Sequence, residues 1–484
     1  MRENKRYQGK ILDQKSWKRD NSDRLFDIIY SEKQNNDNDL AIKLYGKKDH
    51  RYKDLKARFK DNLITSILAI DPHNQDILTP SKKYYALIRE MAVVKILTIR
   101  TLHQAAIFFA RRCYSKASDL GYYDIMYDAV WVLKYYSGIM LKKEAEYFKY
   151  KEALSHIKDV LDLENQAFSY YAELLLMFKK VRVNIDTCNK FAEKSYKELA
   201  PYLLTCHSSR FQMMTRLLRL MHYSAISDFE SMLKYTVEDI DYFYEKYKTG
   251  SNALYIFLTQ KTTACIRLGK YDKGLASIKY ALTMVNERTV NWFPMKYNEY
   301  FIYMQSGKYQ EAQKIYLKVI NHRRYKNLVP SMKENWIIGG AYLNYIIEKG
   351  ELEPHNKFKF RIGKFLNEVP EYSKDRRVKN IPILIAQIIF MIYRKQTGTV
   401  IDRMDAIKQY CGRNLRYNEA VRSNSFIMAL MEIPKHSFNR IAVERHIGRF
   451  TKRLQEVPLH LSGKNFDLEI IPYERLLGYV LEDL

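Results

Sequence analysis

The chain has 484 residues, of which 81 are lysine or arginine and 55 are aspartate or glutamate, so its net charge at pH 7 is +26. Hydrophobic residues make up 47%, which is ordinary for a folded protein and excludes disorder throughout the chain. With only 17 glycines and 11 prolines, the sequence lacks the many turns of a β-sandwich and the glycine-rich loops of most α/β enzymes. We therefore expect an all-α protein of long helices and short turns.

Residues 1–80 form a basic N-terminal region with short helices. Apolar residues at helical spacing predict helices over 23–31 and 52–70, and QNNDND at 34–39 indicates a loop. The first 20 residues resemble a flexible electrostatic tether. Its cations are Lys5, Arg6, Lys10, Lys15, Lys18 and Arg19.

Residues 81–457 read as helix after helix, and the apolar periodicity predicts most of the boundaries. The expected helices are two within 81–118, then 124–140, 142–160, 163–180, 185–199, 208–223, 227–247, 381–395, 399–411, 416–431 and 438–456. The remaining segment, 458–484, contains an apolar-polar alternation at 466–471 and a short helix at 473–481. We interpret it as a C-terminal capping tail, because a stack of helix pairs must cover its last apolar face.

Two adjacent segments, 254–286 and 295–321, share a turn with a glycine and a tyrosine, followed by small residues on a second helix. The first segment carries Gly269, Tyr271, Gly274 and Ala281, and the second carries Gly307, Tyr309, Ala312 and Tyr316. This pattern resembles the tetratricopeptide repeat family. The glycine allows the chain to turn, the tyrosine fills the gap between the helices, and the small residues let the helices approach.

The resemblance implies an α-solenoid of antiparallel helix pairs, a tetratricopeptide-like superhelix. It is clear over about residues 254–321 and degenerate elsewhere. The two turn glycines are 38 residues apart (307 − 269), against about 34 in the ideal repeat. Neither unit ends in proline, and the first-helix Trp and Gly positions do not match. A poorer third unit has its first helix around 335–342, its turn at 349–352 and its second helix at 358–369.

The sequence contains none of the common nucleotide-binding, metalloprotease or hydrolase motifs. His355 lies near Glu351 and Glu353, as expected of a solvated turn. Cys206 and His207 are adjacent in the sequence, and since adjacent residues on a helix point about 100° apart, we do not expect them to pair directly. The acidic stretch at 238–241 reads as a solvated face or as a partner for basic neighbours. We expect no catalytic residue, no cofactor and no metal site, and hence no enzyme.

The five cysteines are far apart and form no CxxC pair: Cys113, Cys188, Cys206, Cys265 and Cys411. This spacing argues against a disulfide framework and favours a reducing compartment. The N-terminus lacks the apolar core of a secretory signal. The longest apolar stretch, about 381–393, is shorter than the roughly 20 residues of a spanning helix and reads as a buried helix. We expect a cytoplasmic protein with no transmembrane segment.

Cations gather in several stretches that could bind an anionic partner by charge. In the stretch 440–454, Val443, Ile447, Phe450 and Leu454 share an apolar stripe, and the cations Arg445, Arg449, Lys452 and Arg453 lie off it. The pair Arg111 and Arg112 is a second candidate. Further basic stretches are 357–364, 374–379 and the pair Arg323 and Arg324. An ordinary solvated face remains the alternative for each of them.

The leading hypothesis is a non-catalytic scaffold or adaptor that binds an acidic protein or peptide in the groove of the superhelix, because tetratricopeptide resemblance implies protein binding. The alternative is a nucleic-acid-binding or transcription-regulatory factor that uses the basic surface. Residues 1–80 show no convincing helix-turn-helix pattern, which weakens the regulatory version. The 40 tyrosines read as helix-packing aromatics rather than as a surface on which bases stack.

Overall fold

The computed structural model describes residues 21–31, 36–69, 79–179, 184–247, 251–367, 380–398, 400–401, 421–459 and 469–484. Within these ranges the protein is all-α and contains no strand. Most helices pack against the next one along the chain. The basic arm at 1–19, the stretch 374–379, Cys411 and nearly all of the expected helix 399–411 lie outside the described residues.

The N-terminal region contains three helices with a small core of their own. They are α2 (Asn21–Ser31), α3 (Asp37–Tyr45) and α4 (Arg51–Ala69). Helix α3 corrects the sequence prediction, which placed a loop over 34–39. The side chain of Asn36 accepts a hydrogen bond from the amide of Asp39 at 2.8 Å, which caps the helix start. Leu40, Ala41 and Leu44 are buried against α2 and α4.

The middle of the chain is an array of helices with two further cores. Its elements are α5 (Thr79–Ile99), α6 (His103–Leu120), α7 (Tyr123–Val132), the π-helix η3 (Leu133–Met140), α8 (Glu144–Lys179), α9 (Ile185–Leu199), the 3₁₀ turn η4 (Ala200–Leu203), α10 (Ser209–Ala225) and α11 (Phe229–Tyr247). Helix α8 is one element where the sequence predicted two, because residues 144–179 contain neither glycine nor proline. The expected helix 124–140 changes from α to π geometry at Leu133.

The last part of the described chain shares one large core. Its elements are α12 (Asn252–Arg267), α13 (Tyr271–Met284), α14 (Trp292–Ser306), α15 (Tyr309–Ile320), the 3₁₀ turn η5 (Tyr325–Asn327), α16 (Pro330–Glu348), α17 (Ile362–Asn367), α18 (Asn380–Tyr393), α20 (Val421–Lys435), α21 (Arg440–Glu456) and α22 (Tyr473–Glu482). Helix α17 is shorter than the expected 358–369. Phe358 and Phe360 precede it in non-helical backbone and pack against Tyr316 and Phe365.

Helix α18 contains the longest apolar stretch, and the structure confirms that it is a buried helix. Ile385, Ala386, Ile389 and Phe390 have no exposed surface. Among the helices that the structure describes, none combines the length and the apolar character needed to cross a membrane.

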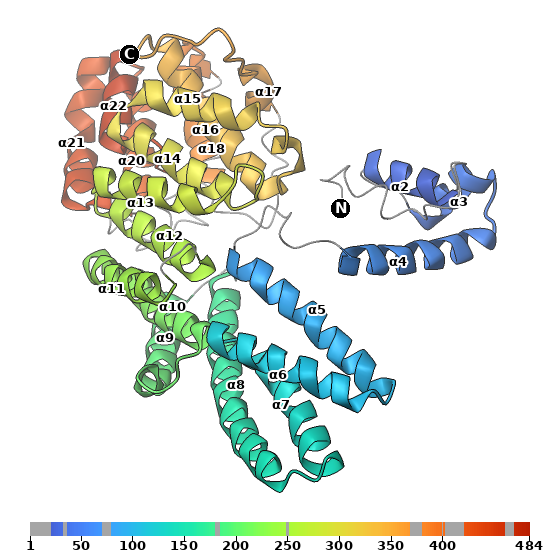
Figure 1. Ribbon diagram of the computed structural model, residues 1–484. Coiled ribbons are helices and arrows are strands. Elements are labelled where there is room, and N and C mark those ends of the chain that lie inside the picture. The colour runs from blue at the N-terminus through green and yellow to red at the C-terminus, as the bar shows by residue number, and fades with distance from the viewer. Residues whose placement is uncertain are drawn as a thin grey trace.

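Figure 1 shows how these groups are arranged. The helices α12–α22 form one body, α9–α11 lie beside it, and α5–α8 project away from it. The last helix does not extend the row of helix pairs. Helix α22 packs against α18, α20 and α21, so the C-terminus folds back onto the body.

Candidate functional site

The two helix pairs that resemble repeats turn at glycines in left-handed backbone. Gly269 follows α12 with φ = 67°, and Gly307 follows α14 with φ = 76°. Residues with a Cβ rarely adopt this conformation. The next glycine of this kind, Gly350 after α16, has φ = 79° and belongs to the poorer third unit. The first helix of each of these three units therefore ends in the same backbone geometry, but only Gly269 and Gly307 lead directly into a second helix, since α17 does not begin until Ile362.

The small residues and one tyrosine of these units lie in the core. A Cβ on Gly274 would lie 3.0 Å from the Cδ1 of Ile302 in α14, so this glycine permits close packing of α13 and α14. Ala281 and Ala312 are fully buried. The ring of Tyr316 lies 6.2 Å from that of Trp336, measured between centroids, and fills the space between α15 and α16.

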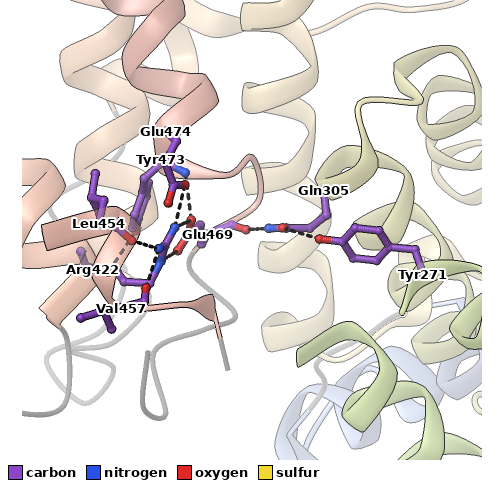
Figure 2. Close-up of polar contacts among 9 residues, drawn as sticks. Tyr271, Gln305, Arg422, Leu454, Val457, Glu469, Tyr473 and Glu474 are labelled. Atoms are coloured by element: carbon purple, nitrogen blue, oxygen red, sulfur yellow. Dashed lines mark hydrogen bonds and ion pairs between the residues drawn. The ribbon is translucent and has the colours of Figure 1, made fainter. Parts of the chain in front are cut away.

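The other two tyrosines reach towards the C-terminal segment, residues 469–484. The Tyr271 hydroxyl donates to the side-chain oxygen of Gln305 at 3.2 Å, and the Gln305 amide donates to the backbone carbonyl of Glu469. Figure 2 shows this chain of contacts running from α13 through α14 to the C-terminal segment. The Tyr309 hydroxyl lies 3.4 Å from that of Tyr479 in α22. Both turn tyrosines thus lie where the chain end docks.

Arg422 of α20 binds the start of the C-terminal segment (Figure 2). Its guanidinium lies 2.6 Å from Glu469 and 2.7 Å from Glu474. It also donates to the carbonyls of Leu454 and Val457 at 2.6 and 2.7 Å. Burial raises the pKa of the Glu469 carboxyl, although Arg422 and the amide of Tyr473 favour its ionised form. This buried cluster joins α20, the end of α21 and the C-terminal segment.

The far end of α22 is held by a second polar cluster. Asp483 accepts hydrogen bonds from the Tyr345 hydroxyl at 2.8 Å and from Lys349 at 2.9 Å. Arg475 approaches the turn at Gly307 from the same helix. Helix α22 therefore covers the turn edge of the pairs that begin with α14 and α16. An incoming partner would find this edge occupied by the chain's own C-terminus.

Helix α21 presents the first set of predicted cations to solvent. Val443, Ile447 and Leu454 are buried and Phe450 is partly buried, which confirms the predicted apolar stripe. The helix packs against α20 and α22. Its opposite face is exposed, so the sequence correctly placed the cations on the outside.

The four cations of this face differ in their partners. Arg449 lies 3.7 Å from Glu432 and over the Phe450 ring, while Lys452 lies 3.8 Å from Glu456. Both distances exceed those of tight charge-assisted hydrogen bonds. Arg445 and Arg453 are exposed, and neither side chain has a hydrogen bond or ion pair with any residue that the structure describes. The face therefore keeps most of its positive charge available to an external anion.

The second predicted pair, Arg111 and Arg112, forms ion pairs with acidic residues of neighbouring helices. Arg111 lies 2.7 Å from Glu146 of α8, and Arg112 lies 2.8 Å from Glu90 of α5. These contacts tie α6 to its neighbours. Helices α6 and α21 belong to different parts of the molecule (Figure 1). The structure therefore does not bring the two predicted sets of cations together.

Like the Arg422 cluster, a buried ionic cluster around Asp239 of α11 was not identified from the sequence. Asp239 has no exposed surface, and its carboxylate lies 2.6 Å from Arg216 and 2.7 Å from Arg219. Burial raises the pKa of Asp239, against the opposing effect of both arginines. The position could have been found, because residue 239 follows the buried residues 232 and 236 and precedes Phe243 at helical spacing. The sequence analysis interpreted the acidic stretch 238–241 either as a solvated face or as a partner for basic residues. For Asp239, the structure shows the second.

The described residues offer little that would support covalent or metal chemistry. No group of three or more His, Cys, Asp or Glu residues within them is arranged to hold a metal ion. The four cysteines in the described ranges are free and buried. Burial raises the pKa of the Cys206 thiol, which disfavours the reactive thiolate.

Comparison with known proteins adds no relative to this picture. No protein-family model, no curated protein and no solved structure matches the chain.

Proposed function

We propose that this protein is a non-catalytic scaffold that binds an acidic protein or peptide on a tetratricopeptide-like superhelix. The successive packing of neighbouring helices and the left-handed glycines at three turns support the repeat architecture. A stack of this kind offers an extended surface rather than a closed active site. The net charge of +26 favours a partner of opposite sign.

The observation that carries the proposal is the exposed cationic face of α21. Its buried stripe fixes the helix on α20 and α22, so the positions of Arg445 and Arg453 are set by the core. Cations on a rigid element lose less conformational freedom on binding than cations on a flexible loop. Because α22 covers the turn edge of the pairs beginning with α14 and α16, we place the partner on the α21 side of the body.

The test measures binding of a fluorescent poly-glutamate peptide by anisotropy. The variant Arg445→Glu/Arg453→Glu should weaken binding by at least about tenfold, since it reverses two cations of the face. The matched control is Lys47→Glu/Lys48→Glu, which makes the same change in net charge at exposed positions after α3. Equal losses in both variants would contradict a localised site and indicate a general charge effect.

The same measurement separates the protein-binding proposal from nucleic-acid binding. Duplex DNA and single-stranded RNA serve as competing probes over a range of salt concentrations. If either binds more tightly than poly-glutamate, with a steep salt dependence that the α21 variant flattens, the acidic-protein proposal fails. Such a result would favour a phosphate-binding role for the same face.

A further inference from the structure

A second surface lies at the projecting end of the helices α5–α8. The turn between α5 and α6 exposes 82% of Ile99 and 53% of Leu102. The turn between η3 and α8 exposes 49% of Met140 and 39% of Leu141. Large aliphatic side chains this exposed at two neighbouring turns are unusual for a surface that meets only water.

The two turns are neighbours in space. The ring of His103, next to Leu102, stacks on the ring of Tyr136 in η3 with centroids 4.7 Å apart. The carbonyl of Tyr136 accepts a hydrogen bond from the amide of Leu141 at 3.1 Å. Figure 1 shows both turns on the side of α5–α8 that points away from the body α12–α22. We call this end, with its four aliphatic residues, the apolar tip.

The apolar tip is surrounded by positive charge. Arg100, Lys142 and Lys143 lie in the two turns, and neither 91–102 nor 129–143 contains an acidic residue. Glu144 follows Lys143 directly, and Glu146 lies 2.7 Å from Arg111 and 3.5 Å from Lys143, so Arg100 and Lys142 are the cations of the tip without an acidic partner among the described residues. The charge of the tip therefore complements an anionic surface.

Two stacked aromatic residues lie behind the apolar tip. Trp131 and Tyr135 are exposed by 48% and 42%, and their rings are 5.9 Å apart and nearly parallel. With Ile139 they follow one stripe at four-residue spacing, which ends directly before Met140. Trp and Tyr are the residues that favour the headgroup region of a bilayer.

The π-helix fixes this arrangement. Gly138 of η3 faces Tyr147 of α8, and a Cβ at position 138 would lie 2.7 Å from the Tyr147 Cβ. Close contact between η3 and α8 thus requires glycine at this position. The contact holds the end of η3 against α8 and leaves the stripe of Trp131, Tyr135 and Ile139 directed outwards. The π geometry at a surface with unusual exposure agrees with the frequent occurrence of π-bulges at functional sites.

We propose that the apolar tip docks this protein on an anionic lipid bilayer. Ile99, Leu102, Met140 and Leu141 enter the boundary between headgroups and acyl chains, while Arg100 and Lys142 contact lipid phosphates. Trp131 and Tyr135 lie at headgroup depth. Two projecting turns suit a deformable bilayer better than a grooved protein partner. This surface is separate from the α21 face, so the proposal does not depend on the scaffold function.

The experiment is sedimentation of the full chain with vesicles. Binding is compared between pure phosphatidylcholine and a mixture with about 30% phosphatidylserine, at physiological ionic strength. We expect binding to the anionic vesicles and little to the neutral ones. In a Trp17→Phe background, the emission of Trp131 should shift to the blue on binding, whereas Trp292 and Trp336 are already 2% and 1% exposed. The variant Trp131→Phe should lose that shift.

Paired variants locate the contact. Arg100→Gln/Lys142→Gln should weaken binding about 25-fold, from about fivefold for each cation near the surface. Ile99→Ser/Met140→Ser should weaken it by about tenfold or more. The matched control Lys47→Gln/Lys48→Gln removes the same charge at exposed positions after α3 and should bind vesicles nearly as the wild type does. Circular dichroism checks that every variant is folded.

Three outcomes would overturn the proposal. The first is equal binding to neutral and anionic vesicles, or binding to neither. The second is an equal loss in the tip variant and the Lys47→Gln/Lys48→Gln control. The third is binding of a designed acidic amphipathic helix that depends on Ile99 and Met140 when no vesicle binding is seen, which would make this surface a protein interface.

Discussion

The bundle α5–α8 and the body α12–α22 are built from the same kind of helix but end differently. In the body, one core extends through the helix pairs, and the chain's own C-terminus returns to cover the turn edge. In the bundle, a smaller core leaves one end with exposed aliphatic and aromatic residues. In the body, therefore, the turn edge is covered by α22. In the bundle, the exposed end is not covered by any element that the structure describes.

The polar contacts differ in the same way. Arg422 in the body is 4% exposed and binds two carboxylates and two carbonyls. Arg111 in the bundle is about half exposed and binds a single carboxylate, together with the hydroxyl of Ser137. Removing one partner lowers the free energy of unfolding much more in a buried ionic cluster than in an exposed ion pair. This difference can be measured by changing one residue in each region.

The largest effect is expected for Arg422→Ala. The change leaves Glu469 buried without its cation and two carbonyls without a donor. We expect a loss of about 3–5 kcal/mol in the free energy of unfolding, measured by chemical denaturation. Proteolysis should also release the C-terminal segment first, because this cluster holds its start.

Arg111→Ala is the matched control, because it removes the same side chain from the bundle. Its loss should stay below about 1 kcal/mol. Similar losses in the free energy of unfolding for the two variants would contradict the comparison. They would mean that the buried Arg422 cluster stabilises the body no more than a surface ion pair does.

The next largest change in stability is expected when alanine replaces Gly340 in α16. A Cβ there would lie 2.3 Å from the Tyr316 hydroxyl and 2.9 Å from the Phe360 ring. Gly340→Ala should lower the free energy of unfolding by about 1–3 kcal/mol through overpacking. Gly448→Ala in α21 meets nothing within 4 Å and should instead raise it by about 0.5–1 kcal/mol. If Gly340→Ala left the free energy of unfolding unchanged, the side chains around position 340 would have to rearrange at little cost, contrary to this prediction.

A smaller loss of stability is expected when alanine replaces glycine at two turns that have the same left-handed backbone. Gly121 ends α6 with φ = 69°, and Gly307 ends α14 with φ = 76°. Alanine at either position should lower the free energy of unfolding by about 1 kcal/mol through left-handed strain. Only at Gly307 would the new Cβ also meet Arg475, 2.9 Å away. We expect the Gly307→Ala loss to be the larger of the two, and thermal unfolding of both variants tests it.

The sequence predicted the helices well where periodicity and breakers agreed. The turns at Gly269 and Gly307 and the buried stripe of α21 follow from local rules that act within a few residues. The prediction divided α8 because amphipathic periodicity alone does not show whether two helical stretches are continuous. It missed α3 because polar residues at 36–39 resemble a loop when their capping role is not considered.

The candidate site was predicted only in part, because ion pairing is a property of tertiary structure. Arg111 and Arg445 look alike as residues on solvated helices. Only the positions of α5 and α8 show that Arg111 and Arg112 are occupied, and only the packing of α21 shows that Arg445 is not. The return of α22 joins residues more than 130 positions apart, such as Tyr345 and Asp483, which no local pattern indicates.

The smallest effect concerns the exposed ion pairs of the bundle. Burial acts to raise the pKa of Glu90, but hydrogen bonds from Lys116 and Arg112 outweigh it and lower the pKa. A lowered pKa means that this carboxylate stabilises the fold above its unfolded pKa of about 4.3, and that the contribution is lost as the pH falls below it. Glu90→Gln should therefore lower the unfolding midpoint by about 1–2 °C at neutral pH. The difference from wild type should shrink towards about pH 3. A difference that stays constant across this range would mean that Glu90 acts by packing, and that the bundle depends less on its surface charges than the comparison with the body implies.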